Sequence, residues 1–401
     1  MQEEPVILLE GPRAVGKSTL LRQIAQLTNG TIIDLDDLPT RTLAQEDPTL
    51  AIDVEGPVLV DEYKHAPDLL SAIKARLNRT GSQPGQFVLT GSSRYDTLPR
   101  TAEALTGRLH RMQILPLAQS ELVGTMGLLP RLFDEGSDVV SSALSTTTRQ
   151  NYITRITTGG FPDVLTRSTV TGRNRWFDDY VQATLAKDVT ELKKIRQAHA
   201  LPAVLSALAG QTAQVLNMNH IAQDLRLNPD LVANYISLLE AVFLIRVLPA
   251  WGKTLTARSA GNPKIHVVDS GVAARLLRLS DEKLARADAT SLTEFGHLAE
   301  TFVVSELVKE ASWMDSIAGV GHWRTYDGDE VDLVVERDDG MIVAIEVKAG
   351  TQANKASFRS LSLLRDKIGP AFRLGVVFHM GQRGHHYDDR LIALPIDQLW
   401  L

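Results

Sequence analysis

The sequence predicts a multidomain α/β protein, and three observations support this prediction. The chain has 401 residues, which is more than one ordinary domain core accommodates. Short apolar runs alternate with amphipathic helical patterns over residues 6–120, as expected for a parallel sheet covered by helices. Helical patterns dominate residues 151–285, and helix and strand patterns alternate again from residue 294 on. We therefore predict three parts, at residues 1–128, 129–285 and 286–401.

The composition is that of an ordinary globular protein, with 44% hydrophobic and 22% charged residues. Cysteine is absent, which excludes disulfides and thiolate metal sites. The acidic start, MQEEP, differs from a secretory signal, and no apolar stretch has membrane-spanning length. We therefore expect a cytoplasmic protein without membrane contact. The net charge of -6 gives no overall basic surface, so any contact with DNA or RNA must use local patches.

A phosphate-binding loop is predicted at Gly11–Ser18, GPRAVGKS, which matches the pattern G-x-x-x-x-G-K-[ST]. The match lies between a strand pattern and a helix pattern, where backbone amides and the helix N-terminus would face phosphate groups. Lys17 is expected to reach the β- and γ-phosphates of ATP, and Ser18 to bind Mg2+. The residues predicted to contact the nucleotide are Gly11, Pro12, Arg13, Ala14, Val15, Gly16, Lys17, Ser18 and Thr19.

Catalytic residues are predicted on two further strand patterns. The first, VLVDE at residues 58–62, ends in Asp61, expected to hold Mg2+ through water, and Glu62, expected to polarise the attacking water. The second, FVLTGSS, ends in polar residues that include Thr90 and Ser92. Ser92 is the predicted sensor of the γ-phosphate, although a plain turn would explain the same residues equally well.

Two arginines downstream of these strands are candidate arginine fingers, namely Arg94 and Arg108. Either could act within its own chain or on a neighbouring copy, and each is also compatible with an ordinary surface position. A finger that acts on a neighbouring copy would require a homo-oligomer.

The segments GPRAVGKST, VLVDE, FVLTGSS, LTGRL and LPLAQSEL occur in this order along the chain. This arrangement resembles the prokaryotic AAA-superfamily ATPases that carry a C-terminal domain of unknown function. The resemblance covers nearly the whole chain. It implies an ATPase core with a P-loop NTPase sheet, a helical and winged-helix middle, and a C-terminal nuclease-like fold.

A winged helix is predicted near residues 217–250, from a short helix, a turn, a second helix over residues 231–240 and a strand. The second helix offers Asn234, Tyr235 and Ser237 as readers of base edges, but no lysine or arginine. Phosphate contacts ordinarily depend on those two residue types, so a structural or lid role is favoured over DNA contact.

The C-terminal part contains residues that resemble a PD-(D/E)XK nuclease site. Asp332 lies on one strand pattern, Glu346 and Lys348 lie on the next, and Glu300 lies on the preceding helix. Residues i and i+2 of a strand face the same side, so Glu346 and Lys348 can address one place beside Asp332. The three carboxylates suit Mg2+ or Mn2+, and Lys348 would orient or deprotonate water. The alternative is a strand with charged residues on its solvent face.

Together these features predict a Mg2+-dependent ATPase that gates a winged-helix and nuclease-like module acting on nucleic acid. The alternative is an ATP-dependent switch, toxin-like or regulatory, with a structural C-terminal domain. A nuclease needs Asp332, Glu346 and Lys348 to converge on metal, whereas a regulator tolerates their loss.

Overall fold

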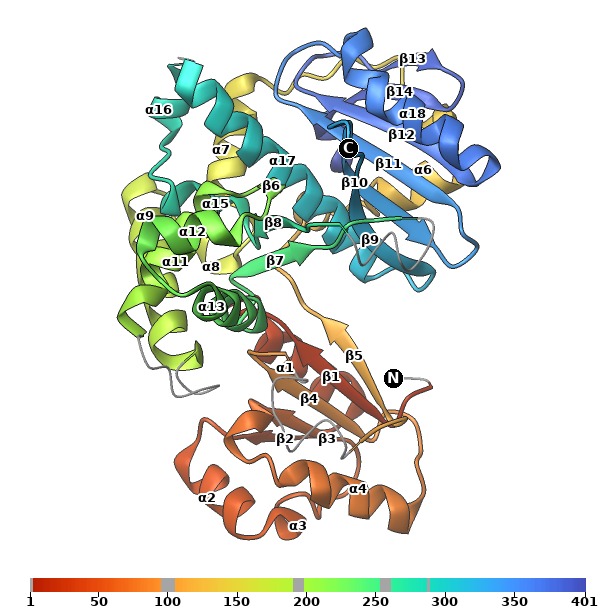
Figure 1. Ribbon diagram of the computed structural model, residues 1–401. Helices are drawn as coiled ribbons and strands as arrows, with labels where there is room; N and C mark the ends of the chain where they lie inside the picture. The colour runs from red at the N-terminus through yellow and green to blue at the C-terminus, as the bar shows by residue number, and fades with distance from the viewer. Residues whose placement is uncertain (1–2, 95–104, 190–197, 253–260, 287–288) are drawn as a thin grey trace. The chain divides into compact units, whose positions relative to one another are not determined.

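The computed structural model describes residues 3–94, 105–189, 198–252, 261–286 and 289–401 (Figure 1). The chain forms two compact units. Unit 1 comprises residues 1–116, 182–196 and 241–243, and unit 2 comprises residues 117–181, 197–240 and 244–401. The three-part division proposed from the sequence, with boundaries near residues 128 and 285, stays a prediction.

Unit 1 is built on a parallel sheet, as the sequence predicts. Its strand order is β2-β3-β4-β1-β5, and every described strand pair in it is parallel. The strands are β1 (Val6–Glu10), β2 (Thr31–Asp34), β3 (Val58–Asp61), β4 (Phe87–Gly91) and β5 (Leu109–Gln113). Because β4 lies between β1 and β3, the residue that ends β4 lies beside the ends of both neighbours.

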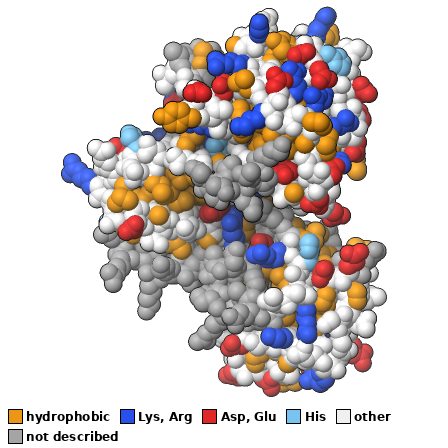
Figure 2. Space-filling model, turned by 45° about the vertical axis from the view of Figure 1, so that its right-hand side comes forward, with side chains coloured by type: hydrophobic (Ala, Val, Ile, Leu, Met, Phe, Trp, Pro, Cys, Tyr) orange, Lys and Arg blue, Asp and Glu red, His pale blue; other side chains and the backbone are white. Residues whose placement is uncertain are grey.

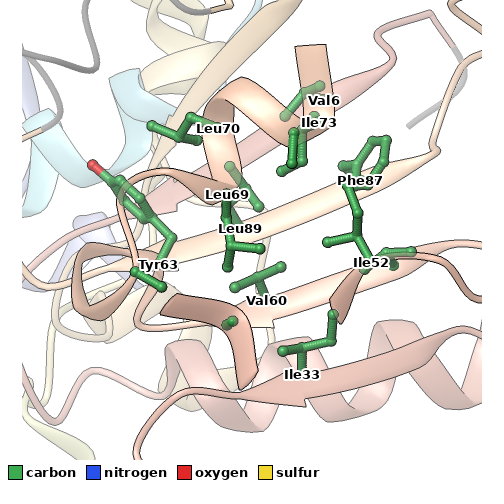
Figure 3. Close-up of a cluster of buried hydrophobic side chains, with 14 of the residues drawn as sticks. Val6, Ile33, Ile52, Val60, Tyr63, Leu69, Leu70, Ile73, Phe87 and Leu89 are labelled. Carbon is green, nitrogen blue, oxygen red and sulfur yellow. The ribbon is translucent and has the colours of Figure 1, made fainter. Parts of the chain in front are cut away.

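Helices cover both faces of this sheet, because alternate strand residues point to opposite sides. Ile7 and Leu9 of β1 pack with Leu21 of α1 on one face. Val6 and Leu8 pack on the other face, in the cluster of buried side chains drawn in Figure 3. The helices are α1 (Lys17–Thr28) on the first face, and α2 (Leu38–Glu46), α3 (Pro48–Ala51) and α4 (Leu69–Thr80) on the second.

The first part of unit 2 is mostly helical, as expected. Its helices of four or more residues include α5 (Gln119–Val123), α6 (Leu129–Asp134), α7 (Arg149–Thr158), α8 (Pro162–Leu165), α9 (Val170–Ala183, which continues into unit 1), α11 (Leu201–Gly210), α12 (Met218–Leu225), α13 (Pro229–Ala241), α15 (Ser270–Leu276) and α16 (Asp281–Ala285). A small antiparallel sheet has the order β6-β8-β7, with β6 (Gln214–Val215), β7 (Ile245–Leu248) and β8 (Lys264–Val267).

Helix α13 is the predicted recognition helix, and the structure corrects one of its proposed base readers. Asn234 and Ser237 are exposed, but Tyr235 is buried because it lies on the apolar face of α13 with Val232 and Leu239. Tyr235 is therefore a core residue and is not available to read a base edge.

The C-terminal part of unit 2 is a mixed six-stranded sheet with the order β13-β14-β12-β11-β10-β9. Helix α17 (Ala289–Ser312) precedes it, and α18 (Arg359–Ile368) connects β11 to β12. The strands are β9 (Ile317–Arg324), β10 (Glu330–Arg337), β11 (Ile342–Lys348), β12 (Phe372–His379), β13 (His385–Asp388) and β14 (Leu391–Pro395). A turn joins β10 to β11 and is closed by a hydrogen bond from Gly340 N to Arg337 O.

Among the described helices, none combines the length and the apolar character that crossing a membrane requires.

Candidate nucleotide site and a buried carboxylate cluster

The predicted phosphate-binding loop lies where β1 ends and α1 begins. Gly16 precedes α1 with φ 97°, and Ala14 has φ 59°, so two residues of the loop have left-handed backbone. A Cβ atom at Gly11 would lie 2.0 Å from the carbonyl oxygen of Ile114, which explains the glycine there. The loop therefore presents its backbone and the N-terminus of α1 to one place, as an anion-binding loop requires.

Lys17 is buried and folds over this loop. Its ammonium group donates hydrogen bonds to the carbonyl oxygens of Gly11, at 2.9 Å, and Pro12, at 2.7 Å. Burial lowers the pKa of Lys17 to about 8, although the negative charge of Glu62 opposes this effect. The ammonium group of Lys17, which is predicted to bind the β- and γ-phosphates, is therefore held within the loop.

Thr90 connects the two predicted carboxylates. Its hydroxyl group donates to Asp61 and accepts a hydrogen bond from the backbone amide of Glu62, at 3.0 Å. Glu62 has φ 54°, a left-handed conformation that is uncommon for a side chain of this kind. The contact with Thr90 holds that backbone, so the end of β4 sets the position of the Glu62 carboxylate.

Lys64 is a residue of this site that the sequence analysis missed. Its ammonium group donates to Ser92 Oγ at 2.6 Å and lies 3.8 Å from Glu62 Oε2. Ser92 Oγ also lies 3.4 Å from the same Glu62 oxygen. The predicted sensor and the predicted general base are thus brought together. A lysine two residues after the acidic pair was the available signal.

The oxygen donors at this site suit Mg2+. The Ser18 hydroxyl group and the Asp61 carboxylate are the hard ligands that this ion prefers, and in nucleotide sites it takes only one or two of them from the protein. Among the described residues, no group of three or more histidine, cysteine, aspartate or glutamate side chains is arranged to hold a metal ion. A Mg2+ ion bound with a nucleotide would need only these two protein donors, because phosphate oxygens and water would supply the rest.

Arg108 lies at the wrong edge of the sheet to act within its own unit. Its carbonyl accepts from Val6 at the start of β1, whereas the phosphate-binding loop follows the end of that strand. Five strand residues separate the two edges by about 15 Å. Its guanidinium group binds Asn78 Oδ1 at 2.6 Å. The suggestion that Arg108 acts in its own site is therefore wrong, and action on a neighbouring copy stays a prediction.

Arg94 follows the end of β4, on the same edge as the phosphate-binding loop. Its backbone amide donates to Ala241 O at 3.0 Å, and its guanidinium group lies 5.8 Å from the ring centroid of Phe243. Ala241 and Phe243 both belong to unit 1. A finger role for Arg94 stays a prediction.

The C-terminal carboxylates surround a lysine that the sequence analysis did not consider. Lys264, the first residue of β8, is fully buried and donates to Glu300 at 2.6 Å, to Asp332 at 2.9 Å and to Glu330. We call Glu300, Glu330 and Asp332 the carboxylate cluster. An ammonium group has three N–H donors, and the three carboxylates accept all of them.

Asp332 and Glu346 lie opposite each other on β10 and β11, as their strands' register requires. Asp332 Oδ2 accepts from the backbone amide of Val347 at 2.9 Å, so both of its oxygens are engaged. Glu346 Oε1 binds Lys348 Nζ at 2.6 Å, and its other oxygen is buried without a hydrogen-bond partner among the described residues. The predicted set is therefore close in space, but its acidic members contact lysines.

Charge and burial act in opposite directions on these groups. Burial alone would lower the pKa of Lys264, but the carboxylate cluster raises it well above its ordinary value. Burial raises the pKa of Glu346 to about 8, and the negative charge of Asp332 adds to this effect. A metal site at Glu300, Asp332 and Glu346 stays a prediction, and it would require Lys264 to leave its position.

Comparisons with known proteins support the assignment of unit 1. Residues 3–123 match a family model described as "AAA domain". Residues 149–283 and 295–399 match models described as "Domain of unknown function (DUF8612)" and "Domain of unknown function (DUF4143)". The first match and the site geometry together support an AAA-type P-loop ATPase domain in the N-terminal part.

The relatives found over the whole length carry no assigned activity. The uncharacterized proteins Rv2008c of Mycobacterium tuberculosis and Mb2031c of Mycobacterium bovis are each 27% identical over 401 residues, which is 100% of this chain and 82% of the relative. A solved structure of Thermotoga maritima RuvB is 18% identical, with a TM-score of 0.28 over 60% of this chain and 80% of that one. A score this low supports no argument about the present chain.

Proposed function

We propose that this protein binds ATP with Mg2+ and hydrolyses it. The observation that carries the proposal is the Thr90 hydroxyl group, which joins Asp61 to the backbone of Glu62 at the end of the sheet that also bears the Lys17 loop. The match of residues 3–123 to an AAA domain supports the same conclusion. This arrangement provides a phosphate-binding loop after β1, and a metal ligand and a general base at the end of β3.

In the proposed reaction, each group has one task. The loop amides and Lys17 bind the phosphates, and Ser18 and Asp61 hold Mg2+, which when bound neutralises charge on the phosphate oxygens. Glu62 orients the attacking water and accepts its proton. Lys64 lies 3.8 Å from that carboxylate and donates to Ser92, so it keeps the base and the predicted sensor in one place.

Metal removal tests the proposal directly. We expect the full-length protein to release phosphate from ATP with Mg2+ and to lose that activity in excess EDTA, because the phosphate charge is then no longer neutralised. Phosphate release measured before and after Mg2+ is added back to the same sample is the assay. Hydrolysis that continues at the same rate in EDTA contradicts the proposal.

We also propose that ATP controls the helical part of the chain. The segment Ala241–Phe243 connects α13 to β7, and Arg94 contacts it from the end of β4, two residues after the predicted sensor Ser92. A rearrangement of that strand end on hydrolysis would act first on this segment. This short route supports the gating function inferred from the sequence.

Two outputs of such gating remain candidates. The order α11, β6, α12, α13, β7, β8 is that of a winged helix, which supports action on DNA or RNA. However, the described face of α13 offers Asn234 and Ser237 and no basic side chain. On the face of the molecule shown in Figure 2, basic and acidic side chains are interspersed. The position of Lys264 favours the second candidate, a regulatory switch without nuclease activity.

We expect ATP to promote self-association, because Arg108 can serve as a finger only for a neighbouring copy. The Glu62→Gln variant should retain ATP, and its mass by light scattering should increase when ATP is added. Arg108→Ala should lower turnover by roughly 1,000-fold, the effect typical of a lost arginine finger. Arg79→Ala, which changes an exposed arginine of α4, should have no such effect.

Mixing two inactive variants identifies the copy on which Arg108 acts. Arg108→Ala retains its own phosphate site, and Lys17→Ala retains its arginine, so mixed oligomers should recover part of the turnover. No recovery on mixing, together with an unchanged monomer mass in ATP, rejects the prediction.

A further inference from the structure

We propose that the ammonium group of Lys264 is the permanent cation of the carboxylate cluster and takes the place of a divalent metal there. The C-terminal sheet therefore functions without metal. The inference does not depend on the ATPase assignment, because the cluster lies wholly in unit 2. A cluster that holds no metal favours the regulatory switch over a metal-dependent nuclease.

The oxygens of Asp332 and Glu300 that a metal would need are already engaged within the protein. A metal at this position would need oxygens that point to a common point and are free to bind it. One oxygen of Asp332 accepts from Val347 N at 2.9 Å, and the other accepts from Lys264 at 2.9 Å. Glu300 gives its Oε1 to the same ammonium group at 2.6 Å. These oxygens thus converge on a nitrogen atom that belongs to the chain. Of the three predicted metal ligands, Glu346 alone keeps a buried oxygen without a hydrogen-bond partner among the described residues.

The backbone of Lys264 is fixed within the small sheet, and its side chain is buried. Lys264 lies on β8, which pairs with β6 and β7 through the backbone, so the ammonium group is anchored inside a sheet. Its side chain is 1% exposed. A metal could enter only if this lysine gave up its contacts with three carboxylates, and breaking a buried ion pair is costly.

The contacts of Lys264 join elements that are distant in the sequence. Glu300 comes from α17, Glu330 and Asp332 come from β10, and Lys264 comes from β8. Strand β8 begins at Lys264, beside the C-terminal sheet, and runs antiparallel to β7 (Figure 1). A backbone bridge between Ala250 and His322 links the same two regions. Lys264 therefore links the small sheet to the C-terminal sheet by ion pairs. A metal ion that exchanges with solvent would provide such a link only while it is bound.

Mn2+ binding without nucleotide tests the proposal. Every protein in the experiment also carries Asp61→Asn, which removes the predicted metal ligand at the phosphate site. The parent on this background should show no Mn2+-dependent change in thermal unfolding. Lys264→Ala should unfold about 10 °C lower, because the carboxylate cluster loses its shared counterion. Mn2+ should restore much of that loss in Lys264→Ala, because the three carboxylates then have a replacement cation.

Two further variants serve as controls. Lys309→Ala removes another buried lysine, which is paired with the single carboxylate of Glu306 at 2.6 Å, and it should lower stability without a comparable response to Mn2+. Adding Asp332→Asn to Lys264→Ala should remove the Mn2+ response, because one ligand is lost.

The proposal is overturned if the parent binds Mn2+ and Asp332→Asn abolishes that binding, because the cluster would then accept metal with Lys264 present. It is also overturned if folded Lys264→Ala gains no response to Mn2+. If Lys264→Ala does not fold even with Mn2+, the comparison of the parent with Asp332→Asn still decides the question: no Mn2+ binding in either supports the proposal.

Discussion

Lys17→Ala is expected to abolish nucleotide binding. The ammonium group of Lys17 is the buried positive charge of the phosphate-binding loop, and it also holds the carbonyl groups of Gly11 and Pro12. The substitution therefore removes both a phosphate ligand and the contacts that shape the loop. A charged hydrogen bond contributes about 1.5–3 kcal/mol, and Lys17 is expected to make one to each of the β- and γ-phosphates. The loss of both should raise the Kd for ATP by roughly 100-fold or more.

Titration with a fluorescent ATP analogue measures this effect. Lys74→Ala is the matched control, because Lys74 is an exposed lysine of α4 in the same unit and its loss changes the net charge equally. Circular dichroism should confirm that both variants are folded. A folded Lys17→Ala variant that binds the analogue like the parent would show that the loop is not the nucleotide site.

The elements of unit 1 were predictable because their signals are local. A strand pattern, a loop motif and a helix pattern follow one another within residues 6–28, so the neighbours in space are also neighbours in sequence. The order of the strands is not local. It places β4 between β1 and β3 and so gives Thr90 its contacts with Asp61 and Glu62. The sequence pointed to Ser92 as the sensor and assigned no role to Thr90.

The same distinction explains the two largest differences from expectation. Arg108 was considered for its own site because it follows the sensor strand, but the sheet places it at the amino end of β1, away from the loop. Lys264 lies 36 residues from Glu300 and 68 from Asp332, at the start of a short apolar strand pattern. Such a lysine normally indicates the exposed end of a strand, and only the tertiary structure brings it among carboxylates.

The position of Lys264 also shows why a short site pattern does not establish activity. The two strands that carry Asp332 and Glu346 and the acidic helix before them form where the sequence predicts them, whereas β9, β13 and β14 were not predicted. These elements determine the fold. Whether the carboxylates bind a metal ion depends on which group occupies the space between them. Here that space holds a lysine from a different sheet, which no pattern within residues 286–401 could reveal.

Glu62→Gln is expected to retain ATP and lose turnover. The amide has the shape of the carboxylate, so the backbone amide of residue 62 keeps its hydrogen bond to Thr90, and Lys17 and the loop are untouched. The side chain can no longer accept the proton of the attacking water. General base catalysis contributes roughly 100- to 10,000-fold, so kcat should fall by about 1,000-fold while the Kd for ATP stays close to the parent value.

Glu46→Gln provides the control, because Glu46 is an exposed glutamate of α2 whose substitution removes the same charge from the same unit. Single-turnover phosphate release measures chemistry apart from product release, and gel filtration after incubation with ATP shows whether nucleotide stays bound. Loss of both binding and turnover in Glu62→Gln would mean that this side chain supports the nucleotide pocket. Equal turnover in Glu62→Gln and the parent would mean that another group activates water. The next residues to replace would then be Lys64 and Ser92, because both lie within 4 Å of the Glu62 carboxylate.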